Sequence, residues 1–183
     1  SLLDEWEALT DPERQPGDDI RPPEPASERP ITDNPRIFRL LVRQAMWRRV
    51  ELLALGRVDE LAGLDSGVAG PESPVSLRSD DPAPLTASEW DDALADYEDE
   101  YGEVPGAIAT DGDARNPALL RIDTDPDPAD TGFTDERRTW LVHQILEDPQ
   151  GDRDWRVEAL VDLDASDASG ELVLWAVGFD PTS

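Results

Sequence analysis

The sequence contains no cysteine and no lysine, and none of its apolar runs approaches the roughly 20 residues that cross a bilayer. Without cysteine, the chain has no disulfide, no thiol nucleophile and no cysteine-ligated metal. Without lysine, it has no phosphate-binding loop that ends in Lys-Ser or Lys-Thr. No basic segment followed by an apolar one opens the chain, so we expect no export signal, no membrane contact and a cytoplasmic location.

The charge is strongly negative, because 43 acidic residues face 16 basic ones and the formal net charge is -27. All the basic residues are arginine. A high-GC genome and a salt-adapted host each explain this composition. A negative field disfavours broad binding of nucleic acid, since binding to phosphates depends on basic groups. Contact with RNA or DNA would therefore need a local cluster of arginines.

The longest helical pattern covers residues 34–56, NPRIFRLLVRQAMWRRVELLALG. Asn34 is a good N-cap, Pro35 suits the first helical position, and Gly56 can end the helix in a left-handed conformation. The apolar residues form more than one stripe, which predicts a helix enclosed by other elements. These residues are Ile37, Phe38, Leu41, Val42, Ala45, Met46, Val50, Leu52 and Leu53.

Arginines occupy the remaining strip of this helix, with Arg36, Arg39 and Arg43 at i, i+3 and i+7. They could form a solvated face that pairs with acidic groups of the same chain, or a strip that binds phosphate or a partner. The groups that surround these arginines in the folded protein distinguish the two interpretations. If carboxylates of the same chain pair with them, the arginines stabilise the fold; if they face open water, they remain available for a ligand. Together with Arg48 and Arg49, they are the candidate contact residues.

The segments around this helix suggest three parts of the chain. Residues 1–10 form a short amphipathic segment, too short to be stable alone, which we expect to dock on this domain or on a preceding one. Residues 11–33 are rich in proline and acidic groups and predict an extended linker. Residues 34–183 are expected to form a single domain. The segment's apolar residues are Leu2, Leu3, Trp6 and Leu9, and its acidic residues are Asp4, Glu5 and Glu7.

Two further helices and four strands are predicted beyond residue 56. The helices are 57–65 and a segment that begins with a capping box at Thr86 and Glu89 and ends at Gly102. From residue 117 the apolar period becomes two. Short turn-forming joins predict an antiparallel meander, hence an α+β fold in which the long helix crosses one face of a curved sheet. The expected strands are 117–123, 139–146, 155–164 and 172–179.

Few residues carry a specific chemical signal. His143 is the sole histidine and lies within a predicted strand, where packing explains it more readily than catalysis. Two aspartate groups have spacings that suggest calcium, but the first has Pro128 where the sharp-turn glycine of the loop should stand. We therefore expect no catalytic residue, no metal and no cofactor in this chain. The aspartates are Asp123, Asp125, Asp127 and Asp130 in the first group, and Asp162, Asp164 and Asp167 in the second.

Three stretches resemble a known family. The run RIFRLLVRQAMWRRVELLAL resembles the signature of a domain of unknown function at the C-terminal end of actinobacterial DEAD/DEAH-box helicases of the superkiller-like branch. SLLDEWEAL is similar to the tail that follows the helicase body, and ILEDPQGDRDWRVEALVDLDASDASGELVL is similar to the closing strands. The likeness weakens at 66–85 and 124–136. These motifs mark a family and not a chemistry.

The resemblance implies a non-catalytic accessory domain of an ATP-dependent RNA helicase. ATP and magnesium would be bound upstream, and the partners would be the helicase core, another protein or a second copy. Nucleic acid would be reached through the parent protein. The element order is also similar to the cone fold named after nuclear transport factor two, whose members include pocket enzymes and ligand binders. The alternative function is therefore a small-ligand-binding protein or enzyme with an interior pocket near His143.

Overall fold

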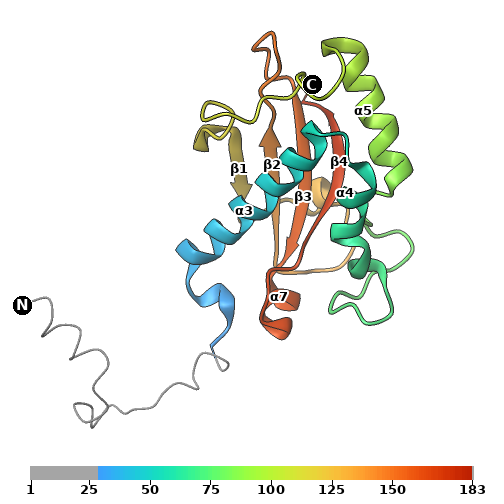
Figure 1. Cartoon of the computed structure of the whole chain (residues 1–183). Helices are drawn as coiled ribbons and strands as arrows, with labels where there is room; N and C mark the ends of the chain where they lie inside the picture. The colour runs from blue at the N-terminus through green and yellow to red at the C-terminus, as the bar shows by residue number, and fades with distance from the viewer. Residues whose placement is uncertain (1–28, 183) are drawn as a thin grey trace, which may run out of the picture.

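The computed structural model describes residues 29–182, which form a four-stranded antiparallel sheet with helices packed on one face (Figure 1). The α+β fold predicted from the sequence is thereby confirmed. The predicted docking segment, 1–10, and residues 11–28 of the predicted linker lie outside the described range. None of the helices within 29–182 combines the length and the apolar character that a bilayer crossing needs.

Helix α3, Pro35–Ala54, forms where the sequence predicts it. The Asn34 side chain accepts a hydrogen bond from the Ile37 backbone N–H at 3.2 Å, and Gly56 has a φ of 73° just beyond the helix. Helix α4, Val58–Asp65, follows directly and continues into the 3₁₀ turn η3, Ser66–Ala69. Local capping signals therefore determine both ends of α3.

Helix α5, Ala87–Tyr101, begins at the predicted capping box. The Glu89 N–H donates to the Thr86 hydroxyl at 3.1 Å, and the Thr86 N–H donates to the Glu89 carboxylate at 2.9 Å. Its apolar stripe is buried as expected, and consists of Trp90, Leu94, Tyr97 and Tyr101.

The sheet is the predicted meander, with the strands in the order β1-β2-β3-β4 and every neighbouring pair antiparallel. The first strand is shorter than the predicted 117–123, because Pro117–Leu119 forms the 3₁₀ turn η4, capped by Asn116, before the short edge strand β1. A register shift between Glu158 and Ala159 marks an irregularity in the pairing of β3 with β4. The strands are β1, Leu120–Asp123; β2, Thr139–Ile145; β3, Trp155–Asp162; and β4, Leu174–Pro181.

Three other local differences from the sequence prediction have simple causes. The third strand ends at Asp162 instead of 164, because the Asp162 side chain accepts from the Ala165 N–H at 2.9 Å and caps helix α7, Leu163–Ser169. A second short helix, α6, Pro128–Thr131, forms before β2. The predicted linker also ends early, since Ile31–Asp33 forms the 3₁₀ turn η2, which a hydrogen bond from the Thr32 N–H to Asp167 ties to α7.

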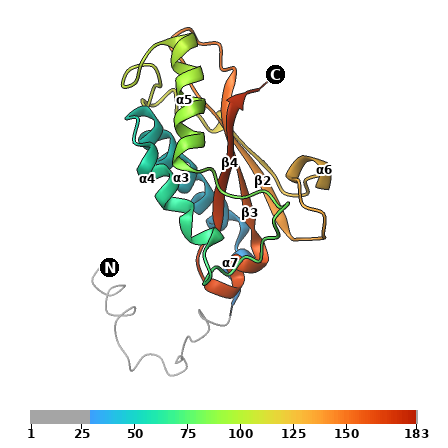
Figure 2. The ribbon, with the colours of Figure 1, turned by 90° about the vertical axis from the view of Figure 1, so that its right-hand side faces the viewer.

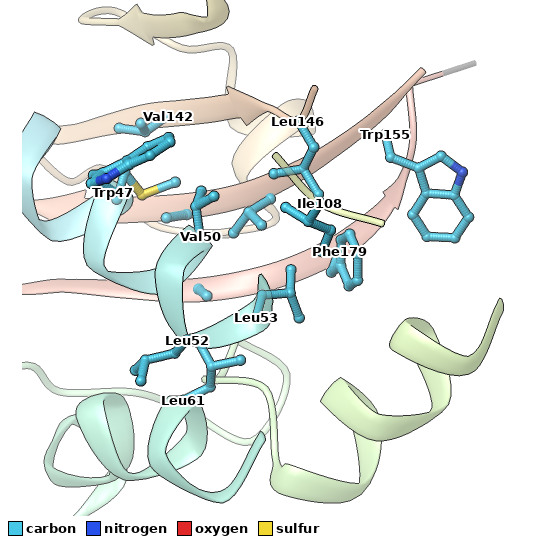
Figure 3. Packing of buried hydrophobic residues seen from close by; sticks show 14 of the residues in the cluster. Trp47, Val50, Leu52, Leu53, Leu61, Ile108, Val142, Leu146, Trp155 and Phe179 are labelled. Carbon is cyan, nitrogen blue, oxygen red and sulfur yellow. The ribbon is translucent and has the colours of Figure 1, made fainter. Parts of the chain in front are cut away.

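The main core lies between the sheet and helices α3, α4 and α5, which share one face in Figure 2. Phe38, Val42 and Met46 of α3 are completely buried against this face, and Figure 3 shows the packing around the second half of the helix. A smaller apolar cluster covers part of the opposite face, where Trp175 of β4 packs with Phe133. The enclosure of α3 is incomplete, however, because Ile37 and Leu40 are half exposed.

Candidate functional site

An open groove of about 770 Å³ lies between the first half of α3 and the edge strand β1. Ile37 and Leu40 are 50% and 47% exposed, and with Leu120 and Ile122 they give the groove its apolar surface. The groove arises because Phe38 and Val42 turn toward the sheet, which leaves other positions of the same turns uncovered. Its polar lining residues are Asn34, Arg36, Arg39 and Arg43.

The groove arginines have no ion pair with a carboxylate of residues 29–182. The Arg39 guanidinium lies over the Trp140 ring, 5.5 Å from its centroid, and Arg43 donates to the Arg115 carbonyl at 3.3 Å. Arg36 is exposed. Within this range, the strip thus retains positive charge for an occupant of the groove.

Two of the five predicted contact arginines lie elsewhere. Arg48 is exposed on the same helix but lines a different hollow, beside the segment around Pro105. Arg49 is buried, donates to the Ala45 carbonyl at 2.8 Å and forms an ion pair with the buried Asp65. As a contact residue, Arg49 is therefore a wrong prediction, because its helix position faces α4 and not solvent.

His143 lies on the face of the sheet opposite α3. Strand alternation places it beside Leu141 and away from Trp140 and Val142, which pack on the helix side. Its Nε2 atom is 2.8 Å from the carboxylate of the cross-strand residue Glu158. An open hollow of about 580 Å³ at this pair is also lined by Arg121 and Arg156. The histidine is thus a surface group and does not line a space between the helices and the sheet.

The hydrogen bond from His143 lowers the pKa of Glu158 below its usual value, while partial burial opposes this shift. Because the folded-state pKa is depressed, the associated stability is present above the unfolded-state pKa and is lost as pH falls through the folded one. We predict that His143→Gln moves the pKa of Glu158 upward and makes unfolding less sensitive to acid. Carboxyl NMR titration measures this shift.

Asp135 provides an internal control for that titration. Its pKa is lowered by a hydrogen bond from Arg137, away from His143. The pKa of Asp135 should therefore stay unchanged in the His143→Gln variant. An unchanged pKa of Glu158 would show that another group holds its carboxylate.

The aspartates with calcium-like spacing mostly serve the backbone. Asp123 accepts from the Asp125 N–H at 3.0 Å, and Asp127 caps α6. In the second group, Asp162 caps α7, and Asp167 accepts from Thr32 and pairs with Arg138. Within residues 29–182, no three groups of the metal-ligating types histidine, cysteine, aspartate and glutamate lie close enough together to hold an ion.

Sequence reasoning missed the apolar half of the groove. Leu40 belongs to neither apolar stripe of α3 and falls on the arginine strip, between Arg36 and Arg43. An apolar residue on an otherwise charged strip is the feature of the sequence that could have indicated an exposed apolar surface here. The contributions of Leu120 and Ile122 had no such signal, because they depend on where β1 lies relative to α3.

One family model, described as "Domain of unknown function (DUF3516)", matches residues 1–179. No curated protein and no solved structure matches the chain. The likeness to the nuclear-transport-factor-two cone accordingly stays a prediction from element order.

Proposed function

The chain belongs to the family described as a domain of unknown function (DUF3516), and we propose that it is a non-catalytic accessory domain of an actinobacterial ATP-dependent RNA helicase. The resemblance of RIFRLLVRQAMWRRVELLAL to the helicase-associated signature supports this proposal. In such a parent protein, the ATP- and magnesium-binding motifs lie upstream. The role of this domain is to contact the helicase core, a partner protein or another copy of itself.

The observation that carries the contact role is the groove between α3 and β1. It joins half-exposed apolar residues, Ile37 and Leu40, with arginines that have no carboxylate partner within residues 29–182. Exposed apolar surface rimmed by charge is typical of protein interaction sites. A protein segment fits this surface better than a sugar-phosphate backbone does, because much of the lining is apolar and the chain carries a net charge of -27.

The broad test removes residues 34–183 from the parent helicase. We expect the truncated protein to retain ATP binding, because the motifs for it lie outside this domain, and to lose partner capture or efficient unwinding. ATPase, strand-unwinding and pull-down assays measure these effects. If all three activities stay unchanged, the domain has no accessory role.

A sharper test changes only the groove. We predict that Leu40→Glu combined with Arg36→Glu weakens the contact of the domain with its partner by about tenfold or more, which is the effect of losing one central interface residue. The matched control is Leu64→Glu with Arg48→Glu, since Leu64 is 44% exposed and both residues lie outside the groove. Equal losses in the two double variants would argue for a non-specific charge effect.

A further inference from the structure

The α3–β1 groove selects an occupant that is both apolar and acidic. Ile37 and Leu40 offer apolar surface, and burying it from water is favourable. Arg36 and Arg39 lie along the same groove, so carboxylates on the occupant would meet complementary charge. An acidic amphipathic segment meets both requirements.

A second copy of this chain that used the same face would meet these two requirements, apolar surface and negative charge, poorly. A two-fold contact places the same patch on both sides. Arg36, Arg39 and Arg43 would then face arginines of the other copy, and like charges brought together at an interface oppose binding. The groove therefore favours an occupant with the opposite charge.

Residues 1–10 of this chain have the required chemistry. Three carboxylates accompany four large apolar residues with helical spacing, within the sequence SLLDEWEALT. Ten residues at the helical rise span about 15 Å, about the length from the N-cap Asn34 to Arg43 of α3, between which the helix side of the groove lies. The family match covers both residues 1–10 and the groove.

The chain between residue 10 and η2 is long enough for residues 1–10 to reach the groove. Roughly 20 residues separate residue 10 from η2, and an extended chain of that length reaches about 65 Å. The groove begins at Asn34, directly after η2. A covalent connection of this length gives an effective concentration of up to about the millimolar range, so even a weak contact would be populated.

We propose that residues 1–10 dock in the α3–β1 groove, with their apolar side against Ile37 and Leu40 and their carboxylates beside Arg36 and Arg39. This inference rests on the proposed function in one respect, since it names the occupant of the groove that the accessory domain uses for contact. The contact is intramolecular, and it fixes the domain to the part of the chain that precedes the linker.

The test uses the whole 183-residue chain with a spin label. Because the sequence has no cysteine, Thr10→Cys gives a single attachment point that spares the apolar and acidic residues of the segment. Isotope-labelled isoleucine methyl groups report on the label's position. We expect the Ile37 and Ile122 signals in the groove to broaden strongly, while Ile108, which lies near the other end of α3, keeps its intensity.

Variants identify the contact. Leu40→Glu should lower the docking equilibrium about tenfold or more and restore the Ile37 signal, whereas the equally exposed Leu64→Glu should leave the broadening intact. Arg36→Glu should weaken docking, whereas Arg48→Glu on the same helix should not. The proposal is overturned if the groove signals do not broaden, or if they broaden to the same extent in the Leu40→Glu variant.

A mixing experiment separates this contact from exchange between copies. Spin-labelled chains without isotopes are combined with isotope-labelled chains without the spin label, and we expect no broadening. Broadening here would assign the groove to another copy's segment and overturn intramolecular docking. If docking fails while the groove variants still weaken the helicase contact, the proposed function stands with another occupant. If docking occurs while truncation leaves the helicase unchanged, the proposed function fails alone.

Discussion

Replacing Asp65 with alanine is expected to lower the free energy of unfolding by about 3–5 kcal/mol, because the change leaves a buried charge without its partner. Asp65 is 1% exposed and forms an ion pair with the buried Arg49 of α3. Its other carboxylate oxygen accepts a hydrogen bond at 2.9 Å from the Ala176 N–H of β4. One side chain of α4 thus links α3 to the sheet. Urea unfolding followed by circular dichroism measures the loss.

Two controls test this explanation. Asp59→Ala removes an exposed carboxylate from the same helix and should change the stability by less than about 0.5 kcal/mol. The double variant Arg49→Met with Asp65→Ala should cost less than the sum of its single changes, because it no longer leaves an isolated charge. Additive costs would mean that the pair is not coupled.

Tyr97→Ala is expected to cost about 3–5 kcal/mol, as large-to-small changes of buried aromatic residues do. Tyr97 is completely buried, and its ring lies 5.4 Å from that of Trp155 and 5.8 Å from that of Phe179, measured between centroids. It therefore joins α5 to β3 and β4. Thermal and urea unfolding measure the effect, and a loss below about 1 kcal/mol would show that the surrounding rings collapse into the space.

The variant Tyr97→Phe separates the contribution of the hydroxyl to stability from that of the ring. The hydroxyl donates to the Ala107 carbonyl at 2.6 Å, so its removal should cost about 1–3 kcal/mol through an unsatisfied buried acceptor. Burial, aided by nearby carboxylates, raises the pKa of Tyr97 in the folded state. The stability is therefore complete below the unfolded-state pKa of about 10 and falls above it. The phenylalanine variant lacks this alkaline loss, so the difference between the two proteins should narrow at high pH.

Local sequence signals predicted most of the secondary structure. The cap at Asn34, the capping box at Thr86 and the alternation along 155–162 each act within a few residues, so the sequence alone displays them. Helix α7 was missed because ASDASG contains turn-forming residues. The Asp162 side chain nevertheless caps a helix there, a competition that tertiary context decides.

The candidate site was predicted only in part. The arginine strip of α3 follows from helical periodicity, and Arg36, Arg39 and Arg43 line one groove. The burial of Arg49 could not be foreseen, since it depends on the position of Asp65 on a neighbouring helix. The groove likewise depends on β1 lying beside α3, a relation between elements more than 60 residues apart in sequence.

The order of the elements along the chain has a consequence for biosynthesis. Helices α3, α4 and α5 are made first, while the strands that cover Phe38 and Val42 come from the last third of the sequence. Each strand pairs with its sequence neighbour, so the sheet can form hairpin by hairpin once those residues leave the ribosome. Until then the apolar side of α3 is uncovered, the condition under which nascent chains aggregate. Mutual repulsion would keep such unfinished chains apart, because acidic residues already outnumber arginines in the part of the sequence that is made first.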